Sequence, residues 1–249
     1  MEFAKGLAAH VFTELGFQVE EIPVCAGRSA DLRIVDSELT YHVEVKEKFE
    51  SAADADVRRE QLMAGEVCWQ TNKLSHDNRI SGILRDAQKQ LDQTDKDHST
   101  FQLIWFHADG VDADLKYLQA FATFYGDVPV SSGRETTHCF YFDYSAAFVM
   151  PSIEAIVLSD HKQLQFCLNE FSPRAGEFRQ SHLCRKFDSI GGVFDPQQIV
   201  RDGLAIACRA TIPRKDDHET ARALQEQTGL KYTPIRMNRY TGSAMVMFG

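Results

Sequence analysis

An aspartate, a glutamate and a lysine near the N-terminus have types and spacings that suit a metal centre. Asp31 begins the apolar segment 31–35, and Glu44-Val45-Lys46 ends a second apolar segment. If both segments are strands, side chains alternate between two faces, so Glu44 and Lys46 point the same way while Val45 points the other way. A short hairpin then brings Asp31 beside Glu44. Two converging carboxylates form a hard oxygen site suited to Mg²⁺, so we expect Asp31 and Glu44 to be metal ligands.

The chemistry expected of such a centre is hydrolysis of a phosphate ester. A bound Mg²⁺ polarises a phosphoryl oxygen and lowers the pKa of a bound water, and Mn²⁺ is the expected substitute ion. Lys46 can position the attacking water or offset the charge that builds on the phosphate. We therefore expect Asp31, Glu44 and Lys46 to be catalytic. The alternative is a solvated hairpin in which Glu44 and Lys46 form a surface charge pair.

The elements that must hold these residues follow from periodicity and turn signals. Phe3, Leu7, Val11 and Leu15 recur at four-residue spacing and predict a helix over 2–15, which Gly16 ends in a left-handed conformation. Alternation of apolar and polar residues predicts strands at 17–22, 31–35 and 41–46.

The rest of the chain continues as an α/β pattern. Residues 50–78 are a polar excursion with one helical piece at 55–63, after which Asn78 is expected to cap the next helix. An apolar stripe at 3.6-residue spacing predicts that helix over 79–92. The further predicted elements are strands at 101–106, 137–142, 155–158 and 244–248 and helices at 113–125 and 216–228.

This order of elements, together with Asp31 and Glu44-Val45-Lys46, resembles the PD-(D/E)XK nuclease superfamily, with Ala30 at the position of the motif's proline. The resemblance implies an α/β fold with a restriction-endonuclease-like core, a central mixed β-sheet flanked by helices, and a C-terminal α+β extension. It also implies that the chain hydrolyses DNA phosphodiester bonds, with DNA as its partner. We expect residues 1–170 to form the nuclease-like domain and residues 171–249 to form the extension, in which Ser172–Gly176 is the best linker candidate.

The resemblance suggests two further site positions. Many members place a glutamate in the first helix, where this chain has Lys5; Glu2 and Glu14 are the acidic residues nearby. Many also place a glutamine on the helix after the catalytic strand. Gln88 and Gln90 both flank the apolar stripe there, and we expect Gln88 to serve.

Two other functions remain open. The chain can be a module that has the same scaffold without catalysis and binds a nucleic acid or a protein, or it can be a subunit of a larger defence or repair assembly. Trp69 can stack on a base, but we expect it to make a peripheral core contact. Four basic residues are either phosphate contacts or ordinary exposed charges: Arg174, Arg179, Arg185 and Lys186.

Composition limits the function classes. The net charge is −9, which argues against non-specific coating of nucleic acid. Residues 171–249 carry 12 Lys and Arg against 8 Asp and Glu, which leaves 15 against 28 in residues 1–170. This asymmetry suits an acidic metal-binding part joined to a mildly basic part, although chance variation over a solvated surface explains it as well.

The remaining signals concern location, thiols and histidines. There is no apolar run of about 18 residues and no secretory signal, so we expect a cytoplasmic protein without a membrane partner. Self-association remains open. The six cysteines form no Cys-x-x-Cys pair, which favours reduced buried thiols over disulfides or zinc. The nine histidines show no paired metal-ligand spacing, so most are expected on the surface or at caps.

Overall fold

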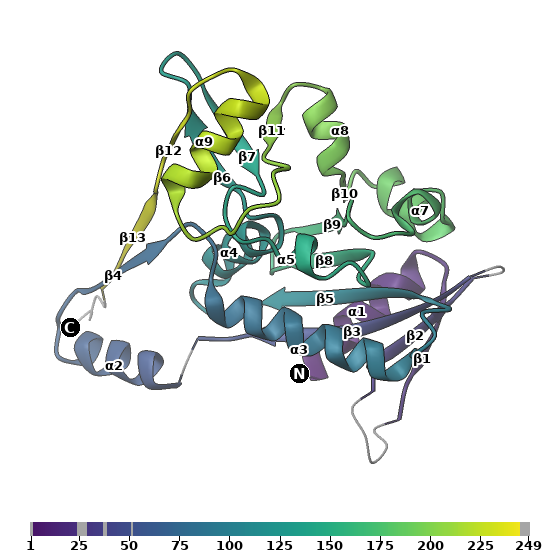
Figure 1. The fold of residues 1–249 in the computed structure, drawn as a ribbon. Helices are drawn as coiled ribbons and strands as arrows, with labels where there is room; N and C mark the ends of the chain where they lie inside the picture. Colours follow the sequence, from purple (N-terminus) through teal and green to yellow (C-terminus); the bar gives the residue numbers. More distant parts are fainter. Residues whose placement is uncertain (1, 24–28, 37–38, 51, 245–249) are drawn as a thin grey trace.

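The computed structural model of the chain describes residues 2–23, 29–36, 39–50 and 52–244. It is an α/β structure with a large mixed sheet, a smaller sheet above it in Figure 1, and a two-stranded ribbon at one side. Among the described residues no helix combines the length and the apolar character needed to cross a membrane.

Seven described strands form the main sheet. In sheet order they are β1 (Gln18–Glu21), β2 (Leu32–Val35), β3 (Thr40–Lys48), β5 (Phe101–Ala108), β8 (Ala155–Ser159), β9 (Leu164–Leu168) and β10 (Val193–Phe194). The first three strands pair antiparallel, and β3, β5 and β8 run parallel to one another. The predicted strands at 17–22, 31–35, 41–46, 101–106 and 155–158 are confirmed within two residues at each end.

Helices cover both faces of this sheet. The described helices are α1 (Glu2–Glu14), α2 (Ala52–Met63), α3 (Asn78–Thr94), α4 (Ala113–Tyr125), α5 (Ala146–Val149), α6 (Ala175–Arg179), α7 (His182–Ser189), α8 (Pro196–Arg201) and α9 (Asp217–Thr228). On one face α1, α6 and α7 pack against Val43, Val45 and Trp105. On the other face α3 and α4 pack against Ile104 and Phe106, so that α3 crosses in front of β3 and β5 in Figure 1.

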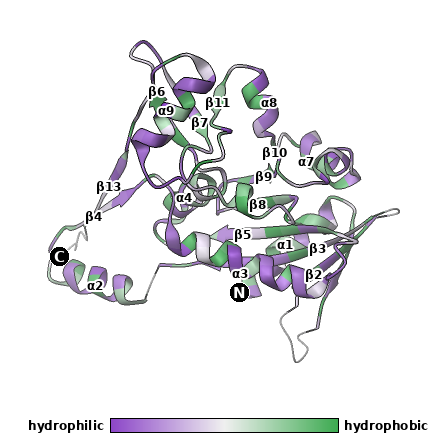
Figure 2. Cartoon of the chain, viewed as in Figure 1, coloured by the Kyte–Doolittle hydropathy of each residue, from purple (hydrophilic) through white to green (hydrophobic). Residues whose placement is uncertain are grey.

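Helix α3 forms because its sequence is strongly amphipathic. Ile80, Leu84, Ala87 and Leu91 are all buried, and the helix shows alternating hydrophobic and hydrophilic colours in Figure 2. The expected cap at Asn78 is wrong by one residue. Asp77 is the N-cap, because its backbone is extended and its side chain accepts a hydrogen bond from Ile80 N–H at 2.9 Å.

The smaller sheet combines strands from distant parts of the chain. Its order is β11 (Ala205–Ala207), β7 (Thr136–Phe140), β6 (Val128–Ser131) and β12 (Thr233–Pro234). Leu224 of α9 packs with Val128 and Val130 on this sheet. After residue 170, α6, α7 and β10 join the main sheet, whereas β11, β12 and α9 join the smaller one. The predicted division between residues 1–170 and 171–249 therefore does not coincide with a boundary between sheets.

The polar excursion after β3 forms a projecting arm. It holds α2 and β4 (Cys68–Lys73), and β4 pairs antiparallel with β13 (Asn238–Ser243) from the far end of the chain (Figure 1). The peripheral core contact expected of Trp69 is wrong, because the residue is 75% exposed. Its ring lies over the Cα of Gly242, where an added Cβ would come within 2.8 Å of it. Most of the closing strand predicted at 244–248 lies outside the described residues.

Candidate metal centres

Asp31 is positioned by backbone hydrogen bonds at the start of β2. Its N–H donates to Val43 O at 3.1 Å, and its carboxylate accepts a hydrogen bond from Val45 N–H at 2.9 Å. Leu32 pairs with Val43, so the same register places Asp31 opposite Glu44. Directly opposed residues of an antiparallel pair share a face, which brings the two carboxylates together.

Glu44 lies in the middle of β3 and is only 2% exposed. Lys46 Nζ donates to its Oε1 at 2.5 Å, while its Oε2 is buried without a hydrogen-bond partner. Burial raises the pKa of Glu44 to about 7; the hydrogen bond from Lys46 opposes this shift, and the nearby Asp31 carboxylate adds to it. The positive charge around Glu44 is therefore too small for its carboxyl group to ionise at the pH at which an exposed glutamate does.

Lys46 connects the strand to α3. Besides Glu44, its Nζ donates to Gln90 Oε1 at 2.6 Å. The glutamine expected at the site was Gln88, but Gln88 instead donates to Ser152 Oγ at 2.9 Å. Gln90 is the glutamine that faces the lysine, because successive helix residues point about 100° apart and positions 88 and 90 therefore face different neighbours.

The acidic residues of the first helix do not join this group. Ala4, Ala8 and Phe12 hold α1 against the face of the sheet that carries Val43 and Val45. Glu44 and Lys46 are on the opposite face, toward α3. Glu2 and Glu14 are exposed residues of α1, and Lys5 forms an ion pair with Glu21 at 3.0 Å.

The donor set fits a hard divalent cation. Asp31 and Glu44 present carboxylate oxygens, and Glu44 Oε2 has no hydrogen bond that an ion would have to replace. A cation beside both carboxylates would also remove the cost of ionising Glu44 next to Asp31. The pair of residues expected as metal ligands is thus adjacent and chemically suited to that role.

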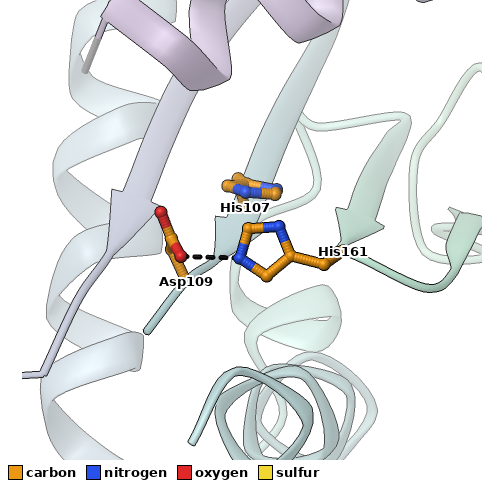
Figure 3. Close-up of side chains that lie close together, drawn as sticks. All are labelled: His107, Asp109 and His161. Atoms are coloured by element: carbon orange, nitrogen blue, oxygen red, sulfur yellow. Dashed lines mark hydrogen bonds and ion pairs between the residues drawn. The ribbon is translucent and has the colours of Figure 1, made fainter. Parts of the chain in front are cut away.

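A second cluster lies at the ends of β5 and β8, on the other face of the sheet. His107, Asp109 and His161 each offer one ligand atom, and these atoms lie within 4.8 Å of one another (Figure 3). His107 is completely buried, whereas the other eight histidines are exposed or partly exposed, as expected for most of them. No local sequence pattern predicts this cluster, because His161 follows β8 and comes beside His107 through the pairing of β5 with β8.

The basic residues considered as phosphate contacts lie away from the carboxylates. Arg174 and Arg179 belong to the region of α6, on the α1 face, and each is already engaged. Arg174 lies over the ring of Phe101 at 3.9 Å, and Arg179 Nε donates to Asp195 at 2.7 Å. The five described cysteines are free and buried, so none of them is tied up in a disulfide.

Comparison of the chain with protein-family models, with curated proteins and with solved structures found no match. The case for any activity therefore comes from the residues and their geometry.

Proposed function

We propose that the chain is a Mg²⁺-dependent nuclease that hydrolyses DNA phosphodiester bonds at Asp31, Glu44 and Lys46. The observation that carries the proposal is the buried oxygen Glu44 Oε2, which has no partner although Asp31 lies opposite and Lys46 binds the other oxygen. Leaving a buried carboxylate oxygen unpaired is costly for folding, and such groups are retained where a ligand satisfies them.

Each residue has a separate task in this proposal. Asp31 and Glu44 hold the cation, which supplies the charge that activates a water and stabilises the phosphate in the transition state. Lys46 keeps its ammonium beside the cluster through Gln90, and this position allows it to orient the attacking water or neutralise a phosphate oxygen. Thr94 supports Asp31 from α3, because its hydroxyl accepts a hydrogen bond from Ala30 N–H at 2.7 Å.

The order of elements supports the same proposal. One helix, three antiparallel strands, the helix α3 and a strand parallel to β3 occur in the order that the PD-(D/E)XK resemblance implies, with α2 and β4 inserted between β3 and α3. The choice of DNA as substrate comes from that resemblance. Lys48 follows Lys46 on the same face and lines a cavity of about 340 Å³ with Arg79 and Lys116. Glu50, Asp54, Asp77 and Asp112 line it as well, so the cavity adds no support for a phosphate backbone.

The test is cleavage of a fluorescently labelled DNA duplex by the purified chain with Mg²⁺. We expect hydrolysis by the wild type, with loss in Asp31→Asn and in Lys46→Ala. A matched control is Lys89→Ala, because Lys89 is on the exposed side of α3 and pairs with Asp86. Cleavage that persists undiminished in both site variants would show that a contaminating nuclease is responsible.

The alternative, a non-catalytic module with the same scaffold, is separated by calorimetry. Titration of the wild type with Mg²⁺ or Mn²⁺ should release or absorb heat that disappears in Glu44→Gln. Binding heat without cleavage would favour a module that keeps its ion. The absence of both would reject the metal centre.

A further inference from the structure

One ring nitrogen of His107 has no hydrogen-bond partner among the described residues and is therefore available to a ligand. The residue is 0% exposed, its Nδ1 is 2.9 Å from Ser159 Oγ, and its Nε2 is buried without a hydrogen-bond partner. When Nδ1–H donates to the serine, the lone pair of the neutral ring is on Nε2. Metal-binding histidines are held in this way, with the second ring nitrogen fixed by a hydrogen bond.

Two other ligand groups lie beside the His107 ring. Asp109 Oδ1 and His161 Nε2 are 2.7 Å apart, and the ring of His107 meets that of His161 edge-on at 5.6 Å (Figure 3). Asp109 Oδ1 also accepts a hydrogen bond from Gly110 N–H. The cluster combines two imidazoles with one carboxylate.

The spacing is close to that of a bound transition-metal ion. Ligand atoms at the usual Zn²⁺ bond lengths lie roughly 3.4 Å apart in a tetrahedron. The three candidate atoms are within 4.8 Å of one another, so the longest separation must contract by at most about 1.4 Å to reach that geometry. Asp109 Oδ1 and His161 Nε2, at 2.7 Å, must instead move apart by about 0.7 Å as the ion replaces their hydrogen bond. His107 is fixed in the core, whereas the side chain of His161 is 53% exposed and follows a strand end, so His161 can supply the movement.

We propose that His107, Asp109 and His161 bind one Zn²⁺ ion. Imidazole nitrogens favour zinc and its transition-metal neighbours, whereas Mg²⁺ favours oxygen, so this site differs in ion from the carboxylate centre. The zinc site is on the opposite face of the sheet from Glu44 and Lys46. His107 of β5 pairs with Glu47 of β3, which follows Lys46 and so is on the other face, and the ring of Phe3 in α1 packs against the His107 ring. The site does not depend on the nuclease proposal.

Three protein ligands leave a fourth position for water or a small ligand. This arrangement is typical of zinc sites with an exchangeable position, whereas purely structural sites have four protein ligands. His161 also lines a cavity of about 350 Å³, which includes Asp160 and Lys162. An exchangeable ligand on the ion therefore has space on the side of His161.

The experiment is a zinc titration of the untagged full chain against a chromogenic chelator, with the bound metal measured after dialysis. We expect one Zn²⁺ per chain in the wild type and in Glu44→Gln. His161→Ala should weaken binding at least about 100-fold, and Ser159→Ala about 10-fold, because the serine only fixes the ring of His107. Zinc should also raise the melting temperature of the wild type but not that of His161→Ala.

The matched control is His138→Ala. His138 Nδ1 lies 2.8 Å from Asp127 and its side chain is 59% exposed, so it reproduces the histidine–carboxylate pair without a second histidine. The His138→Ala variant should bind zinc as the wild type does. His107→Gln should also lose the ion, but His161→Ala carries the test if burial makes His107→Gln fold poorly. The site is rejected if the wild type binds no zinc, if binding survives His161→Ala, or if Glu44→Gln removes it.

Discussion

Glu44 and Glu154 are both buried glutamates of the main sheet region, but their surroundings differ. Burial raises the pKa of each to about 7. Both oxygens of Glu154 are satisfied: Oε2 accepts from Gln102 N–H at 2.6 Å and Oε1 accepts from Ser172 Oγ at 3.1 Å. Glu44 has Lys46 on one oxygen and none on the other.

This difference in hydrogen-bond partners distinguishes Glu154, a structural carboxylate, from Glu44, a carboxylate that can bind a ligand. Glu154 connects the start of β5 to the segment before α6, because it accepts hydrogen bonds from Gln102 N–H and Ser172 Oγ. Both of these partners are uncharged. Glu44 lies opposite another carboxylate, which is the charge pattern of a cation site, and the Lys46 ammonium binds only one of its two oxygens. A perturbed pKa alone therefore does not mark a functional residue; the pattern of partners does.

The largest expected effect is on catalysis. Glu44→Gln should lower the rate of Mg²⁺-dependent DNA cleavage by at least about 100-fold, because it removes the charge that holds the cation. Glu154→Gln should stay within about threefold of the wild type, because its amide can still accept from Gln102 N–H. Single-turnover cleavage rates at saturating DNA measure both. Equal losses in the two variants would mean that Glu44 acts only through the fold.

Stability should show the reverse order. Glu154→Ala leaves Gln102 N–H and Ser172 Oγ without their acceptor and should lower the free energy of unfolding by about 2–4 kcal/mol. Glu44→Ala takes the carboxylate away from Lys46, but the lysine side chain is 18% exposed and keeps Gln90 as a partner. The substitution also removes an unpaired buried oxygen beside Asp31, so it should cost no more than about 1 kcal/mol at pH 8. Urea unfolding of both variants without divalent ions makes the comparison. A larger loss in Glu44→Ala would identify the Glu44–Lys46 pair as a structural ion pair.

The residues around Glu44 show how far sequence reasoning extends. The strands that carry Asp31, Glu44 and Lys46 were predicted because their alternation and the intervening turn are local signals. The hairpin register then follows from the short connection, which places Asp31 opposite Glu44. Local pattern therefore sufficed for the carboxylate pair and for the lysine on the same face.

Features that depend on distant pairing were not predicted. Nothing near Trp69 indicates that β4 pairs with β13, and nothing near His107 indicates that His161 comes beside it. Gln88 and Gln90 flank the apolar stripe of α3 about equally, so only the packing of α3 on β3 decides which one meets Lys46. Tertiary packing, rather than periodicity, fixed these contacts.

The pH dependence of stability tests whether Glu44 and Glu154 titrate alike. Their folded pKa of about 7 is above the ordinary 4.5, so between these values the folded chain binds more protons than the unfolded chain. The free energy of unfolding should therefore fall as pH rises from 4.5 to 7, by up to about 3 kcal/mol for each residue. Glu44→Gln should remove one part of this fall and Glu154→Gln the other.

Mg²⁺ should separate the two contributions. At pH 8 the ion binds ionised Glu44 and should restore part of the lost stability in the wild type and in Glu154→Gln, but not in Glu44→Gln. Thermal unfolding at pH 5 and pH 8, with and without Mg²⁺, measures all three proteins. An equal effect of Mg²⁺ on Glu44→Gln would place the ion elsewhere.

The smallest expected effect concerns the glutamines of α3. Gln90→Leu removes the oxygen that accepts a hydrogen bond from Lys46 Nζ at 2.6 Å. Of the two acceptors described for this ammonium, only Glu44 Oε1 then remains. The lysine should then be less well aligned, and the cleavage rate should fall about 10-fold with little change in Mg²⁺ affinity, because the side-chain hydrogen bond described for Gln90 goes to Lys46 and not to a carboxylate. Gln88→Leu is the matched control, since Gln88 is on the same helix and bonds Ser152 instead. It should leave the rate unchanged. If Gln88→Leu were the slower enzyme, the position first expected from the sequence would be the functional one, and the contact between Gln90 and Lys46 would be incidental to the chemistry.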